Sequence, residues 1–106
     1  MARYLLKVSY TAEGARGLLK EGGTKRKTYV SNLARKAGAK IVTFDFAFGS
    51  DDVYLICEAP GHAEMTALSL SVAGSGAPSI ETVVLISPAE VDAATKKAIA
   101  YRPPGA

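Results

Sequence analysis

Three side chains with complementary chemistry fall on neighbouring predicted strands. Alternation of apolar and polar residues places Asp45, Tyr54 and Lys7 on one face of a sheet, where they supply a carboxylate, a phenol and an amine. In a partly dry cavity such a set could orient a small polar ligand or move a proton. The alternative, which we favour, is a polar network between two subunits. Glu58 and Glu81 share this face and complete the predicted ligand-binding or interface set.

Two residues are candidates for acid–base catalysis, Asp45 and His62. His62 is the only histidine and follows Pro60-Gly61 at a predicted helix start. As a general base it would need a partner and a pocket, whereas a surface role needs neither. We therefore favour a non-catalytic role, and the residues alone assign no reaction. Cys57 has apolar neighbours on its strand, so we expect it to pack in the core rather than to act as a reactive thiol.

A turn sequence between two apolar stretches carries Gly49, Asp51 and Asp52. The two carboxylates could bind a cation, but acidic residues in turns commonly accept hydrogen bonds from their own backbone, and we predict the latter. The lone histidine and the lone cysteine have no second soft ligand near them, so no metal site is predicted. The glycine-rich segments match no phosphate-binding fingerprint, and no cofactor is expected.

The elements that position these residues follow from hydrophobic periodicity and from cap signals. Thr11, Thr24 and Ser87 are predicted to begin helices, and Gly38 to close one. The predicted strands cover 3–10, 41–48, 53–59 and 79–86, and helices follow Thr11 and cover 25–37, 62–73 and 88 to about 100. This β-α-β-β-α-β order with an added C-terminal helix predicts an α+β, ferredoxin-like antiparallel sheet with its crossover helices on one face.

Sorting strand residues by parity separates two faces of the predicted sheet. One set is apolar and should lie under the helices: Tyr4, Leu6, Val8, Phe44, Phe46, Val53, Leu55, Cys57, Ile80, Val84 and Ile86. The other mixes charges with large apolar groups: Arg3, Leu5, Lys7, Ser9, Thr43, Asp45, Tyr54, Ile56, Glu58, Glu81, Val83 and Leu85. A broad apolar patch open to water usually marks an interface, so the mixed face is expected to meet another subunit.

The composition sets limits on these interpretations. With 106 residues, 48% hydrophobic and 22% charged, the chain is expected to be one globular domain, residues 1–106, ending in an extended tail at 102–106. No apolar run approaches the ~20 residues of a membrane span. The N-terminus lacks the zones of a signal peptide, and a cytoplasmic location is expected, which the single cysteine fits.

The net charge of +3 is too small to imply a polyanion partner, although basic residues crowd one segment. We favour a solvated helix face for them over a phosphate-binding surface, so nucleic acid is not an expected partner. The basic side chains are Lys20, Lys25, Arg26, Lys27, Arg35, Lys36 and Lys40.

Five short segments form a distinctive set: Tyr4 to Gly14, Leu18 to Gly23, Phe48-Gly49, Glu58-Ala59-Pro60 and Glu81-Thr82. Taken together, they resemble the GYD-domain family. Gly49 and Asp52 match the Gly-Tyr-Asp signature of that family, but Asp51 stands where its tyrosine is expected. The resemblance implies a ferredoxin-like fold similar to the dimeric α/β-barrel proteins, and it implies no particular activity, because that broad group spans oxygenases, isomerases and ligand sensors.

Three functional hypotheses follow. The first is a homo-oligomeric domain that associates through the mixed sheet face, with a small ligand enclosed as a further option. The second is a cofactor-free enzyme, of oxygenase or isomerase type, that acts on a small aromatic or carbonyl compound with Asp45 or His62 as base. The third and least favoured is polyanion binding through the basic first helix.

Overall fold

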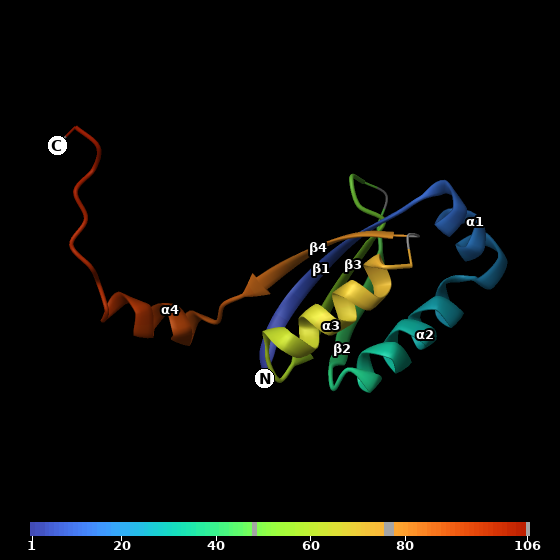
Figure 1. The fold of residues 1–106 in the computed structure, drawn as a ribbon, viewed down its shortest axis with the longest axis horizontal. Coiled ribbons are helices and arrows are strands. Elements are labelled where there is room, and N and C mark those ends of the chain that lie inside the picture. The colour runs from blue at the N-terminus through green and yellow to red at the C-terminus, as the bar shows by residue number, and fades with distance from the viewer. Residues whose placement is uncertain (48, 76–77, 106) are drawn as a thin grey trace.

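The computed structural model describes residues 1–47, 49–75 and 78–105 (Figure 1). Within these residues, four strands form one sheet: β1 (Ala2–Tyr10), β2 (Lys40–Phe46), β3 (Val53–Ala59) and β4 (Pro78–Leu85). Their order is β2-β3-β1-β4, and every neighbouring pair is antiparallel. The predicted α+β ferredoxin-like fold is therefore confirmed. Phe48 of the predicted second strand, residues 76–77 of the predicted loop and Ala106 of the tail lie outside the described residues.

In the described part of the chain, four helices accompany the sheet: α1 (Ala12–Glu21), α2 (Gly23–Lys36), α3 (His62–Ala73) and α4 (Pro88–Thr95). The segment α1–α2 joins β1 to β2, and α3 joins β3 to β4, so each crossover spans one intervening antiparallel strand. No helix among the described residues is long and apolar enough to cross a bilayer.

The core lies between one face of the sheet and the helices α2 and α3. Alternate residues of the two central strands point into it, which confirms the predicted parity. Ala34 from α2 and Met65 and Leu68 from α3 close it from the helix side. The buried residues of β1 and β3 are Tyr4, Leu6, Val8, Val53, Leu55, Cys57 and Ala59. The opposite side of the sheet, here called the open face, carries the mixed set of residues.

A β-bulge in β2 lies between Ile41 and Thr43, where the register against β3 shifts. Ile41 pairs with Cys57 and packs against the core, whereas Thr43 pairs with Ile56 on the open face. One extra residue in one strand resets the alternation, so residues on its two sides no longer follow a single parity.

The cap signals predict most helix ends correctly. Thr11 accepts a hydrogen bond from the Gly14 backbone N–H, and Gly38, with φ +80°, follows the end of α2. The predicted N-cap at Thr24 is wrong, because α2 already begins at Gly23 and Gly22, with φ +85°, precedes it. The two helices are thus separated by one glycine.

The C-terminal helix begins as predicted but is shorter. Ser87 and Glu90 form a reciprocal capping box with Pro88 in the first turn. The helix ends at Thr95 instead of near Ala100, and every residue from Ile86 to Gly105 is exposed. A helix of this length that packs against nothing gains little beyond its cap, which accounts for its early end.

The helices do not cover the whole of the sheet face on their side. Val84 and Ile86 were predicted to lie under helices, yet they are 51% and 63% exposed. Phe46 is also partly exposed, although it stacks edge-on against Phe44 with ring centroids 5.4 Å apart. The end of β4 is therefore left open, and the chain runs on from it away from the body (Figure 1).

Candidate functional site

The predicted site residues on the open face form a row across all four strands. Asp45 of β2 pairs with Tyr54 of β3, Tyr54 with Lys7 of β1, and Lys7 with Glu81 of β4. We call these four residues the polar row. Cross-strand partners are close enough for their side chains to interact, so the fold brings together four of the five members of the predicted set.

One ion pair is formed within the polar row. The Lys7 Nζ lies 3.5 Å from Oε2 of Glu81, and the lysine side chain is less exposed than that of its partner. An exposed pair of this kind contributes little stability in a single chain. If water were excluded from the open face, the attraction between Lys7 and Glu81 would be stronger. Neither charge could then be left unpaired, because a buried unpaired charge is strongly destabilising.

Two further rows run parallel to the polar row. An apolar row lies next to it and contains Thr43, Ile56, Leu5 and Val83. A charged row lies beyond and contains Lys40, Glu58, Arg3 and Leu85. Glu58, the fifth predicted member, therefore belongs to the charged row, two rows away from Lys7. The open face has an apolar centre between two rows of mixed charge.

The signature turn is tied to β1 through its carboxylates. Asp52 Oδ2 accepts a hydrogen bond of 2.7 Å from the Tyr10 backbone N–H, and Asp51 Oδ1 accepts one of 2.9 Å from the Ser9 hydroxyl. The Tyr54 hydroxyl lies 3.5 Å from Asp51 Oδ2. Among the described residues, the donors to these carboxylates come from the end of β1 and from Tyr54, and not from the turn's own backbone as predicted. Gly49, the third turn residue, is exposed.

His62 lies apart from the polar row. It stands at the start of α3, on the helix side of the sheet, and its Nδ1 is 2.6 Å from the hydroxyl of Tyr4. The two rings meet edge-on with centroids 5.6 Å apart. Asp45 points to the open face, so the two candidate catalytic residues occupy opposite faces of the sheet and cannot act in one site.

The Tyr4–His62 pair borders a groove of about 400 Å³ between α3 and β4, which we call the α3–β4 groove. Its wall carries a hydrogen bond of 3.1 Å between the hydroxyls of Ser69 and Thr82. Its lining residues are Tyr4, His62, Met65, Thr66, Ser69, Leu70, Ala73, Ile80, Thr82 and Val84. Sequence reasoning missed this groove, because Tyr4 and His62 are 58 positions apart and neither belongs to a local motif.

Cys57 lies in the core, as predicted. Its side chain is fully buried, and the Sγ lies 3.3 Å from the sulfur of Met65. Burial raises the pKa of this thiol to about 11, because the thiolate would lose its hydration. The thiolate is the nucleophilic form, so Cys57 is poorly suited to chemistry at neutral pH.

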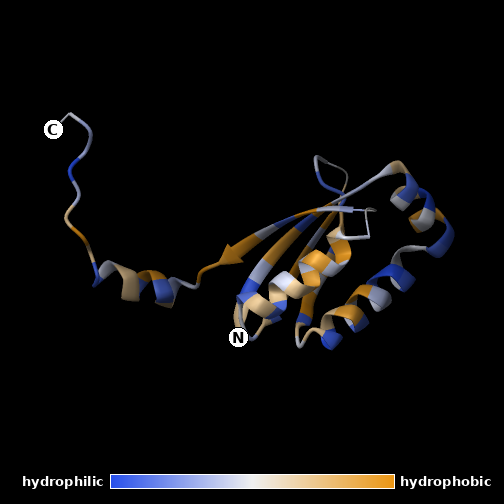
Figure 2. Ribbon diagram, in the orientation of Figure 1, coloured by the Kyte–Doolittle hydropathy of each residue, from blue (hydrophilic) through white to orange (hydrophobic). Residues whose placement is uncertain are grey.

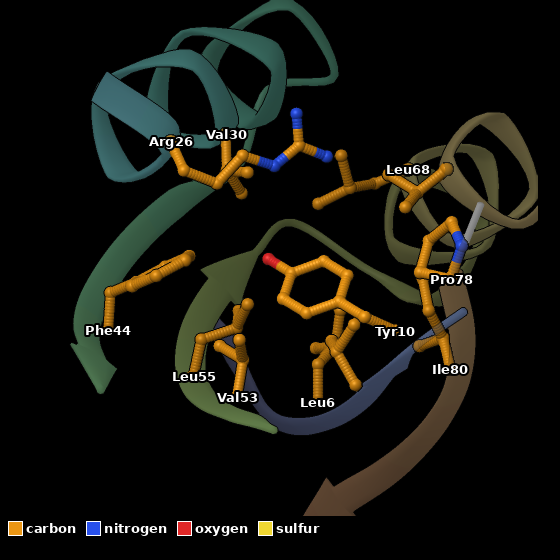
Figure 3. Close-up of a pocket in the computed structure, with 12 residues that line it drawn as sticks. Leu6, Tyr10, Arg26, Val30, Phe44, Val53, Leu55, Leu68, Pro78 and Ile80 are labelled. Atoms are coloured by element: carbon orange, nitrogen blue, oxygen red, sulfur yellow. The ribbon is translucent and has the colours of Figure 1, made fainter. Parts of the chain in front are cut away.

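A small cavity of about 30 Å³ lies inside the core between α2, α3 and the sheet. Figure 3 shows the Arg26 side chain of α2 reaching across its open side, with Tyr10 below it. The carbon atoms of a long basic side chain can cover apolar surface while the charge stays near water. Arg26 thus covers part of the core. This role could not be predicted from the sequence, where Arg26 is one of several basic residues in the same segment.

The other predicted basic residues are exposed. Five of them lie on the helices α1 and α2, as expected of a solvated helix face: Lys20, Lys25, Lys27, Arg35 and Lys36. Lys40 instead begins β2 and belongs to the charged row. Within the described part of the chain, no cluster of three or more histidine, cysteine or acidic side chains could hold a metal ion.

No curated protein matches the sequence. A family model does match: it is described as the GYD domain and covers residues 4–95, from the third residue of β1 to the last residue of α4. The matched region includes the polar row, the signature turn and the α3–β4 groove. The chain therefore belongs to the GYD-domain family.

Proposed function

We propose that this small domain functions as a self-associating module that pairs with a second copy through the open face. The observation that carries the proposal is the banding of that face, with the apolar row between the polar row and the charged row. An apolar strip of Leu5, Ile56 and Val83 flanked by charge resembles the core and rim of a protein interface.

The banding also suits twofold symmetry. A twofold axis that lies between two stacked sheets and passes through the apolar row brings the two apolar rows together. Each flanking row carries both positive and negative groups, so Lys7 or Arg3 of one copy finds an acidic partner on the other. Burial of these charges is tolerated only when they are paired.

A ligand site would follow from such pairing. The polar rows of two copies would surround a region with phenol, amine and carboxylate groups, which suits a small polar molecule. Native mass spectrometry of the purified protein tests this extension: a co-purified compound that is lost in Tyr54→Phe supports it, and a bare oligomer contradicts it.

The experiment that tests the association itself uses Ile56→Glu, which places a charge in the middle of the apolar row. The variant is expected to have half the molar mass of the parent in multi-angle light scattering, because a buried unpaired carboxylate disrupts the contact. Leu19→Glu is the matched control: Leu19 is 86% exposed on α1, away from the open face, and this variant should keep the parent mass. A monomeric parent, or an unchanged mass in Ile56→Glu, would refute the proposal.

A further inference from the structure

The C-terminal arm, residues 86–101, carries four large apolar side chains that are at least half exposed to water. Ile99 is 89% and Tyr101 79% exposed, and Ile86 and Val91 are at least half exposed. Figure 2 shows hydrophobic positions recurring along this arm between hydrophilic ones. A stretch of such residues, held away from the body, is costly in water unless something covers it.

The α3–β4 groove also exposes apolar side chains that nothing in the described part of the chain covers fully. Leu70, which lines it, is 67% exposed, and Val84 on the opposite wall is about half exposed. Most of the other lining groups are apolar or are hydroxyls already paired with each other. The groove is therefore suited to an apolar occupant. Val84, which lines it, lies two residues before Ile86, the first residue of the arm.

The geometry at the root directs the arm away from its own groove. Ser87 is extended, with φ −73° and ψ 156°, and Pro88 follows it. A proline disfavours the helical conformation for the residue before it, so Ser87 cannot readily turn the chain back. The capping box then holds the first turn of α4 in that direction. The radius of gyration of 17.1 Å, against ~13 Å for a compact chain of this length, reflects the extended arm.

We propose that the arm docks in the α3–β4 groove of a second copy of this chain. Because each copy has one arm and one groove close to the same point, a twofold axis near Ile86 and Ser87 lets the two arms exchange reciprocally. Sixteen arm residues and ten groove residues on each copy agree with the roughly 20–30 residues a side of a stable interface.

This contact does not depend on the proposed open-face association. The groove lies on the helix side of the sheet, where α3 forms one wall, and the polar, apolar and charged rows lie on the other side. Failure of one proposal would leave the other intact, and the two can be tested with different residues.

Cysteine cross-linking tests the exchange in the full-length chain. Leu70→Cys places a thiol in the groove, and Val91→Cys places one on α4; a short bis-maleimide then joins thiols that lie close together. Equal amounts of the two single variants, one of them carrying an affinity tag, are mixed and treated. The expected product is a covalent tagged–untagged dimer, formed several-fold more than from either variant alone. The buried native Cys57 should not react, and the parent chain controls for it.

The pair Leu19→Cys with Val91→Cys is the matched control, because Leu19 is even more exposed than Leu70 but lies on α1, outside the groove. This pair should give only the product expected from random collisions. The double variant Leu70→Cys/Val91→Cys, diluted into excess parent, tests whether the arm instead occupies the groove of its own chain. A predominantly intrachain link would show that the arm folds back on its own groove and would overturn the proposal, as would equal yields from the groove pair and the control pair.

Discussion

Tyr4 joins the first strand of the chain to the first turn of α3. Its ring is buried in the core, while its hydroxyl reaches the imidazole of the exposed His62. A hydroxyl in this position must have a partner, because an unsatisfied buried polar group destabilises a fold. At the scale of single residues, the contact explains why a tyrosine and not a phenylalanine occupies the core here.

Tyr4→Phe is expected to lower the free energy of unfolding by about 0.5–1.5 kcal/mol, the net contribution of one hydrogen bond, because the ring still fills its place. Urea denaturation measures this change. Tyr101→Phe, on the exposed arm, serves as the control and should leave the stability of the body unchanged. A double variant with His62→Gln should lose less than the sum of the two single changes, and strict additivity would argue against the contact.

Because of Cys57, the free energy of unfolding should depend on pH in the alkaline range. Its pKa is about 11 in the folded protein against 9.0 without burial, so the folded state holds the proton more tightly. The stability linked to this thiol is complete below pH 9 and declines as the pH rises from 9 to 11, since the unfolded chain alone ionises there. In that window the free energy of unfolding of the parent should fall by about 1.4 kcal/mol per pH unit more than that of Cys57→Ala. The two proteins differ only in this side chain, so the difference between their curves reports on the thiol. Parallel curves for the two proteins would contradict the assignment.

The strands could be predicted from the sequence because their residues alternate strictly. Tyr4, Leu6 and Val8 point into the core, and the hairpin residues on β3 follow the same rule. The bulge after Ile41 could not be predicted, since it depends on how β2 aligns with β3 and no glycine marks it. The helix end at Thr95 was missed for a related reason, because apolar spacing predicts a helix face whether or not anything packs against that face.

The candidate site was predictable only where it follows strand parity. Asp45, Tyr54, Lys7 and Glu81 share a row because the antiparallel register pairs strand residues that point to the same face of the sheet. The α3–β4 groove was not predictable, since it arises where α3 stops short of covering Val84. A sequence pattern indicates which side of a strand is apolar, and only tertiary packing shows how much of that side a helix covers.

Two glycines at the element scale should respond to alanine in opposite directions. Gly17 lies inside α1 with open space around it, so Gly17→Ala should stabilise the protein by about 0.5–1 kcal/mol through better helix propensity. Gly38 has φ +80° after α2, a conformation that costs an L-residue about 1–2 kcal/mol, so Gly38→Ala should destabilise it. Thermal unfolding compares the two variants directly. A stabilised Gly38→Ala would mean that α2 ends differently in solution.

At the scale of the whole molecule, the chain has two unsatisfied surfaces on opposite sides of one sheet. The open face is banded by charge and apolar side chains, and the helix side carries an open groove beside an extended arm. The principal extents of 57 × 33 × 22 Å describe a body with a projection rather than a closed globule. These two surfaces are the ones on which the two proposed contacts depend.

The two proposed contacts should therefore be separable in solution. Ile56→Glu removes the open-face contact, and Val91→Asp places a charge on the apolar side of the arm helix and removes the groove contact. Each single variant should remain associated through the surface that it retains, whereas the double variant should be monomeric in sedimentation velocity. The monomer should give a scattering radius of gyration near 17.1 Å, because nothing then covers the arm. A value near the ~13 Å of a compact chain would show that the arm folds back on its own body. A monomeric Ile56→Glu variant would show that the arm does not hold two copies together. A monomeric Val91→Asp variant would show that the open face does not.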